Sequence, residues 1–188
     1  MKARTIRLTL FVGVFLSVLV ALAVAAQALA VQDRYTLKVP NGLAFSEFRG
    51  YEDWQVVAPS ATDSANVMRV ILANPVMMKA YREGTPANGK PFPNGSKVAK
   101  IEWQPRKITD APFSAKAPDT VPGVLTEVEL MEKDTKRFSD TNGWGYGVFK
   151  YNAASDTFIP DGNDAKCGAA CHKPAAATDY IFTAYPKR

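Results

Sequence analysis

Both cysteines and the only histidine of the chain stand within six residues, Cys167-Gly-Ala-Ala-Cys171-His172. Two thiols can add to the two vinyl groups of a porphyrin, and an imidazole beside the second thiol can reach the iron. The segment therefore predicts a covalently attached c-type haem, held by Cys167 and Cys171 and ligated by His172. The usual spacing has two residues between the cysteines, and three stand here. Because these three are small, we expect a loop that bulges by one residue, with attachment by a single thioether as the alternative.

Two other uses of the same residues are open. A disulfide between Cys167 and Cys171 suits an oxidising compartment, but it leaves the adjacent histidine unexplained. A zinc ion needs four ligands, and carboxylates would have to complete the set because the sequence has no further cysteine or histidine. Haem attachment accounts for all three residues and is the interpretation we prefer.

The first thirty residues have the organisation of an export signal. A basic head without acidic residues precedes an apolar run from Leu8 to about Ala26, and Ala28-Leu29-Ala30 is a small-x-small cleavage site. We predict a signal peptide over residues 1–30, a mature haem domain over residues 31–188, and a location in the periplasm. An uncleaved membrane anchor is the alternative, since the apolar run approaches the length that spans a bilayer.

The composition is typical of one globular domain after this leader. Hydrophobic residues make up 47% and aromatic residues 11% of the chain, which excludes a disordered protein. Three of the 23 basic residues lie in the leader, which leaves 20 against 18 acidic residues in the mature domain. A balance so close to neutral gives no basic surface for a phosphate backbone, so we expect no nucleic acid as a partner.

The elements that must position the cysteine segment are predicted to be a sheet with a few helices. Alternating, β-branched or aromatic residues predict strands over 54–57, 67–72, 96–103, 124–131 and 144–151. Asn74-Pro75 predicts the start of a helix through Tyr81, and residues 41–53 predict helical turns. Residues 84–95 are predicted to be a loop, and 107–123 a long connection or lid. Short connections favour antiparallel pairing, so the predicted class is α+β, a mainly antiparallel β-sheet with a few flanking helices.

Four further motifs carry a family resemblance. They are VILANPVMMKAYREG, FPNGSKVAK, ELMEKDTKRF followed by NGWGYGVF, and CHKPAAATDYIFTAYP. With them the chain resembles the cytochrome P460 family, which includes the cytochrome c′-beta proteins, over residues 51–188. The resemblance implies a homodimer with one five-coordinate haem per chain and an open distal side. Members of the P460 type oxidise hydroxylamine and pass electrons to an acceptor, here a periplasmic one, while related members bind nitric oxide.

The resemblance also implies roles for two strand residues. A lysine on the strand after the Pro93-Asn94-Gly95 turn is cross-linked to the porphyrin in some members, and that position falls on Lys100. A distal carboxylate falls on Glu129, which could accept protons from a small nitrogen compound as a general base. Without the resemblance, Lys100 and Glu129 would be expected to be ordinary solvated residues of a strand.

Aromatic residues and methionines leave further alternatives open. Some aromatic side chains could line the haem pocket or belong to the core, namely Trp103, Trp144, Tyr146 and Phe182. A methionine could supply a sixth iron ligand, and the candidates are Met68, Met77, Met78 and Met131. Three hypotheses therefore stand: an enzyme acting on hydroxylamine or nitric oxide, a gas-binding protein without turnover, and an electron carrier.

Overall fold

The computed structural model describes residues 32–62, 64–108, 120–161 and 165–188. The chain divides into two units, residues 1–32 and Asp33–Arg188, and the second contains all the elements below. The predicted signal peptide lies outside the described residues, as does most of the predicted lid. Within the described part of the chain, no helix has the length and apolar character needed to cross a membrane.

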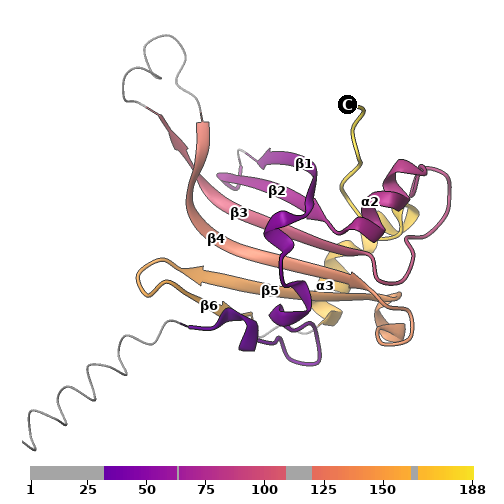
Figure 1. Cartoon of the computed structure of the whole chain (residues 1–188), viewed down its shortest axis with the longest axis horizontal. Coiled ribbons are helices and arrows are strands. Elements are labelled where there is room, and N and C mark those ends of the chain that lie inside the picture. Colours follow the sequence, from indigo (N-terminus) through magenta and orange to yellow (C-terminus); the bar gives the residue numbers. More distant parts are fainter. Residues whose placement is uncertain (1–31, 63, 109–119, 162–164) are drawn as a thin grey trace, which may run out of the picture. The chain divides into compact units, whose positions relative to one another are not determined.

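One antiparallel sheet of six strands runs in sequence order through the domain (Figure 1). Its strands are β1 (Gln55–Thr62), β2 (Val67–Ala73), β3 (Lys97–Lys107), β4 (Thr120–Lys133), β5 (Trp144–Asn152) and β6 (Thr157–Pro160). Each strand pairs with the next one along the chain. The predicted α+β class with a mainly antiparallel sheet is confirmed.

Two strands, β1 and β4, are longer than predicted, and each extension contains a proline. β1 continues through Pro59, which is tolerated because β1 is an edge strand of the sheet. β4 begins at Thr120, inside the segment that was predicted to be a connection, and Pro122 lies opposite Pro105 of β3 where the register is irregular. β6 was not predicted, since its four residues give too short a pattern.

Short helices flank the sheet. They are α2 (Pro75–Arg82), α3 (Ala165–His172) and the 3₁₀ helices η1 (Arg34–Thr36), η2 (Phe45–Phe48), η3 (Tyr51–Asp53), η4 (Ser139–Thr141) and η5 (Lys173–Thr178). The predicted cap of α2 is confirmed, because the Met77 N–H donates to the side-chain oxygen of Asn74 at 3.1 Å. The predicted turns over 41–53 appear as η2 and η3.

The two faces of the sheet carry two apolar clusters. One packs under the N-terminal segment and contains Val39, Leu43, Phe45, Phe48, Leu72, Ala99, Val128, Leu130, Phe149 and Phe158. The other packs under α2, α3 and the C-terminal segment and contains Ile71, Met77, Met78, Tyr81, Phe92, Val98, Met131, Trp144, Tyr146 and Ile181. Alternation along β3 sends Ala99 to the first cluster and Val98 to the second. Lys100 therefore shares the face on which α3 lies.

Candidate haem site

The segment that carries the cysteines is a helix, so the predicted bulged loop is wrong. Cys167 and Cys171 both lie in α3, which ends at His172. Residues four positions apart lie on the same face of a helix, one turn from each other. The three-residue spacing is therefore a helical spacing, and both free thiols line the same cavity.

Gly168 allows α3 to lie directly against β5. A Cβ atom at this position would lie 2.3 Å from Cγ and 2.5 Å from Cβ of Tyr146. Carbon atoms in contact are normally about 3.5–4.0 Å apart, so no larger side chain fits without movement of the strand or the helix. The glycine is thus required by the packing of helix on sheet.

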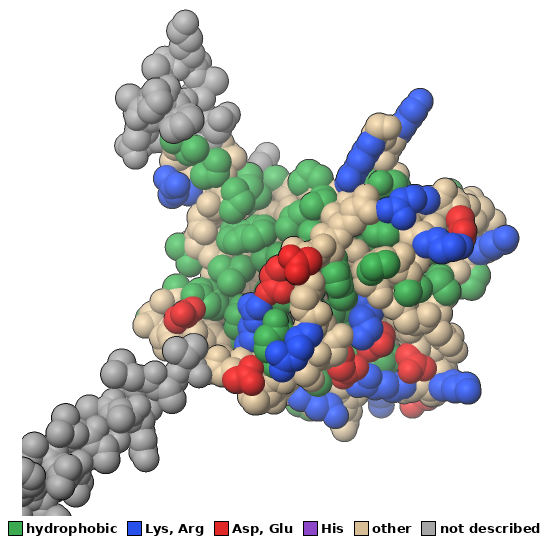
Figure 2. All heavy atoms as spheres, viewed as in Figure 1, with side chains coloured by type: hydrophobic (Ala, Val, Ile, Leu, Met, Phe, Trp, Pro, Cys, Tyr) green, Lys and Arg blue, Asp and Glu red, His purple; other side chains and the backbone are tan. Residues whose placement is uncertain are grey.

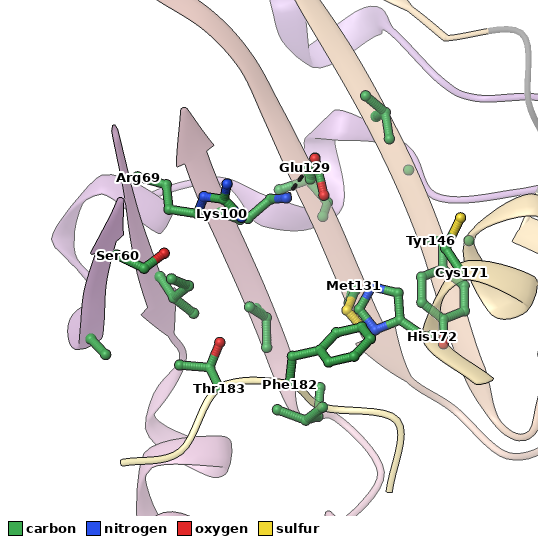
Figure 3. A pocket seen from close by; sticks show the side chains of 18 of the residues that line it. Ser60, Arg69, Lys100, Glu129, Met131, Tyr146, Cys171, His172, Phe182 and Thr183 are labelled. Carbon is green, nitrogen blue, oxygen red and sulfur yellow. Dashed lines mark ion pairs between the residues drawn. The ribbon is translucent and has the colours of Figure 1, made fainter. Parts of the chain in front are cut away.

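A cavity of about 740 Å³ lies between α3, the C-terminal segment and the sheet. Figure 3 shows His172 and Phe182 on one side of it, and Lys100 and Glu129 on another. A volume of this size is typical of cofactor and ligand sites. Of the four aromatic residues proposed from the sequence, Tyr146 and Phe182 line the cavity, whereas Trp103 and Trp144 do not.

Of the two ring nitrogens of His172, Nδ1 forms a hydrogen bond and Nε2 is available to bind a metal. Nδ1 lies 2.7 Å from the backbone oxygen of Tyr180, which can only accept, so Nδ1 carries the proton and Nε2 carries the lone pair. Burial lowers the pKa of His172, although the bond to Tyr180 opposes this effect. The imidazole is therefore neutral at neutral pH, which is the form that binds a metal. Its ring packs between Tyr146 and Phe182, with 5.0 Å between centroids in each case.

Charged residues gather on the neighbouring strands. Lys100 and Glu129 are cross-strand partners on β3 and β4, and their charged atoms lie 2.6 Å apart. Glu102 pairs with the same lysine at 2.9 Å and with Arg69 at 3.4 Å. The two residues that the resemblance assigned are thus brought together at the cavity. Glu102 and Glu127 had been assigned no role, and only the two-residue alternation of β3 and β4 could have placed them on this face.

Glu127 adds a third carboxylate to this group. Glu102, Glu127 and Glu129 each offer one oxygen within 4.8 Å of the others. Burial, followed by the neighbouring carboxylate of Glu129, raises the pKa of Glu127 to about 7. Among the described residues this is the one group of three possible metal ligands, and Lys100 already neutralises part of its charge. The group includes neither cysteine nor the histidine, so nothing here supports the zinc alternative.

The structure distinguishes between the four methionines that were considered as a sixth iron ligand. Met131 lines the cavity. Met77 and Met78 are buried in the core beneath α2, and Met68 is not among the lining residues. Of the four methionines, Met131 alone remains a candidate for the sixth iron ligand.

The family model described as cytochrome P460 matches residues 48–183, most of the chain. The chain belongs to the cytochrome P460 family. The resemblance seen in the motifs is confirmed, and this member of the family is a haem protein with an iron-containing cofactor. A comparison with curated proteins found no match.

The residues around the cavity fit the haem of a cytochrome P460. A neutral imidazole with Nε2 available lies beside two free thiols on one helix. Phe182 is 62% exposed where it lines the cavity, and a porphyrin would cover this apolar surface. The Tyr146 hydroxyl is buried and has no hydrogen-bond partner within the described residues, so a polar group of the cofactor or a water could use it. Cys167, Cys171 and His172 are thus the residues that would hold the haem.

Proposed function

We propose that this protein carries one c-type haem, bound through Cys167, Cys171 and His172, and that hydroxylamine or nitric oxide reacts or binds on its open side. The observation that carries the proposal is a single cavity with an imidazole on one side and the Lys100–Glu129 ion pair on another. The haem iron, when bound, supplies a redox centre and a binding position for a nitrogen atom.

Glu129 is the residue that we propose as the general base. Its carboxylate lines the cavity, and the ion pair with Lys100 at 2.6 Å holds it there. Hydroxylamine releases protons as it is oxidised. A carboxylate in the cavity can accept them directly, so that water does not have to act as the base. The electrons leave to an external periplasmic acceptor.

Glu127 is suited to receive the proton next. Its carboxylate lies within 4.8 Å of that of Glu129, and its pKa of about 7 lets it gain and lose a proton near neutral pH. We therefore propose that Glu129 and Glu127 exchange protons during turnover.

Gas binding without turnover is the second candidate, and the contacts of Lys100 favour it. Its ammonium group lies between Glu129 at 2.6 Å and Glu102 at 2.9 Å. These two ion pairs hold the terminal nitrogen of Lys100 at the carboxylates, which disfavours its cross-link to the porphyrin. An unmodified haem keeps ordinary c-type absorption bands, whereas a cross-link at Lys100 shifts the main ferrous band to the red.

A periplasmic location and a homodimer are proposed on separate grounds. The leader over residues 1–30 supports export. Figure 2 shows hydrophobic side chains gathered on one face of the molecule. Val70, Ile101 and Leu125 pack against the apolar cluster under the N-terminal segment and are only partly buried. An apolar area of this kind suits a second copy of the chain, and light scattering of the purified protein tests this.

The test of the function uses protein matured with a haem-attachment system. Denaturing extraction followed by peptide mapping should find haem on the peptide with Cys167 and Cys171 and report any cross-link at Lys100. Hydroxylamine oxidation with an artificial acceptor, and spectra with nitric oxide, then separate the enzyme from the gas binder. If the protein neither consumes hydroxylamine nor forms a nitric oxide adduct, both forms of the proposal are wrong.

Two variants on β4 isolate the proposed base. We expect Glu129→Gln to lower the rate of hydroxylamine oxidation by about 100-fold, because general-base catalysis typically contributes this much or more. Glu132→Gln is the matched control, since Glu132 lies on the other face of the strand and pairs with Lys97 at 3.3 Å. Equal losses in the two variants would contradict the role of Glu129.

A further inference from the structure

We propose that Lys133 and Asp179 form a positioning pair that sets the hydrogen bond on the iron-binding imidazole. Lys133 and Asp179 do not line the cavity, and their charged atoms lie 2.7 Å apart. The inference rests on His172 as the iron ligand, which is part of the proposed function, but not on hydroxylamine or nitric oxide chemistry.

The backbone at this point is held in an uncommon conformation. Asp179 has φ 50° and Tyr180 has φ 65°, two successive left-handed residues that are not glycine. A left-handed tyrosine persists only where its surroundings hold it. The turn is closed by Tyr180 N–H, which donates to the Ala175 oxygen at 2.8 Å. This conformation directs the Tyr180 carbonyl at His172.

The Asp179 side chain ties this turn to two other parts of the chain. One carboxylate oxygen pairs with Lys133 at the end of β4, and the other accepts the Phe92 N–H at 2.8 Å. Both oxygens are thus used, one by the sheet and one by the loop that follows α2. The position of the turn is therefore fixed relative to the sheet.

Lys133 is itself firmly placed. It is 4% exposed, and its ammonium group lies 5.0 Å from the centroid of the Trp144 ring. Its further contact is the Asn142 backbone oxygen at 3.4 Å. A buried ammonium group needs an anionic partner, and Asp179 supplies it. Removal of either charge would leave the other buried without its partner and loosen the turn.

The link to the cofactor is the 2.7 Å bond between the Tyr180 oxygen and Nδ1 of His172. A strong bond at Nδ1 fixes the tautomer and makes Nε2 a better electron donor to a metal. A more basic ligand favours ferric over ferrous iron. Loosening the turn should therefore weaken this bond and make reduction easier.

The test compares Asp179→Asn and Asp179→Glu in the haem-loaded protein. We expect Asp179→Asn to shift the one-electron equilibrium towards the ferrous form by about tenfold, which corresponds to about 59 mV. Asp179→Glu keeps the negative charge, so its shift from the wild-type potential should be smaller than that of Asp179→Asn. The chain has one histidine, so NMR of the imidazole nitrogens in the ferrous carbonyl form reports the Nδ1–H bond without ambiguity.

A matched ion pair separates positioning from general stability. Lys97 and Glu132 lie 3.3 Å apart on β3 and β4, on the face of the sheet away from the cavity. Lys97→Met should lower the melting temperature without moving the potential or the Nδ1–H signal. If Asp179→Asn behaves in the same way, the inference is wrong. If Asp179→Asn does not accumulate, Lys133→Gln carries the same comparison, because it removes the other charge of the pair.

The outcomes distinguish this inference from the function it rests on. Wild-type protein without histidine-ligated haem would overturn the proposed function, and the inference with it. Wild-type protein with normal ligation, whose potential and Nδ1–H signal are unchanged in Asp179→Asn, would overturn the inference alone.

Discussion

Replacing Gly168 by alanine tests whether α3, which carries the residues proposed to bind the haem, packs closely on β5. In an ordinary helix this change stabilises the protein by about 1 kcal/mol, because alanine has the better helix propensity. Here the added methyl group would lie 2.3 Å and 2.5 Å from Cγ and Cβ of Tyr146. These two atoms are next to the backbone of β5, so a change of rotamer cannot move them both away.

The net change in the free energy of unfolding is the difference between the packing cost of the methyl group and the gain in helix propensity. Adding a methyl group to a well-packed site costs about 1–3 kcal/mol, and contact with atoms so close to the backbone places Gly168→Ala near the upper end. Subtracting the helix propensity leaves a loss of about 2 kcal/mol. For a domain of this size, that corresponds to a fall of about 4–8 °C in melting temperature.

The assay is thermal and urea unfolding of the haem-loaded protein, followed by circular dichroism and by haem absorbance. Ala170→Gly is the control, because Ala170 is exposed in the same helix and should lose only about 1 kcal/mol of helix propensity. A Gly168→Ala variant that is more stable than the wild type would refute the packing argument.

Two further predictions concern the sheet. Asn74→Ala removes hydrogen bonds to the N–H groups of Met77 and Lys97 and to the oxygen of Gly95. We expect urea unfolding to show a loss of about 2 kcal/mol in the free energy of unfolding. The loss should be smaller in Asn74→Asp, which keeps the two bonds that the side-chain oxygen accepts. Glu127 has a native pKa of about 7 against an ordinary 4.5, so the stability it contributes is complete below pH 4.5 and is lost as the pH rises to 7. Glu127 should contribute a slope of at most about 1 kcal/mol per pH unit to unfolding between pH 5 and 7, which Glu127→Gln should remove. An unchanged slope in the variant would show that Glu127 is not a group that titrates there.

Elements with a strong local pattern could be predicted from the sequence. β3 alternates apolar and polar residues, and α2 has both a capping asparagine and a proline in its first turn, so each element was found with small errors at its ends. The three haem-binding candidates were found because cysteine and histidine are rare here and stand together. Lys100 and Glu129 required the family motifs.

The helical state of the cysteine segment could not be predicted in this way. α3 contains Gly168 and several alanines, so it has no apolar stripe and a glycine in its interior. Its stability comes from packing on Tyr146, which is distant in sequence. The pairing of Glu102 with Arg69 was equally hidden, because cross-strand contacts depend on the register of β2 and β3.

The order of the strands has a consequence for how the protein is made. A ribosome produces the chain from its amino end, and each strand of this sheet finds its partner in the segment made just before it. The wall that carries Lys100 and Glu129 can therefore form before α3 emerges, whether from the ribosome or, under the proposed export, across the membrane. A chain that ends after β6 has this wall complete and lacks the three residues proposed to bind the iron porphyrin. Attachment of the pigment would thus wait for the last segment of the chain.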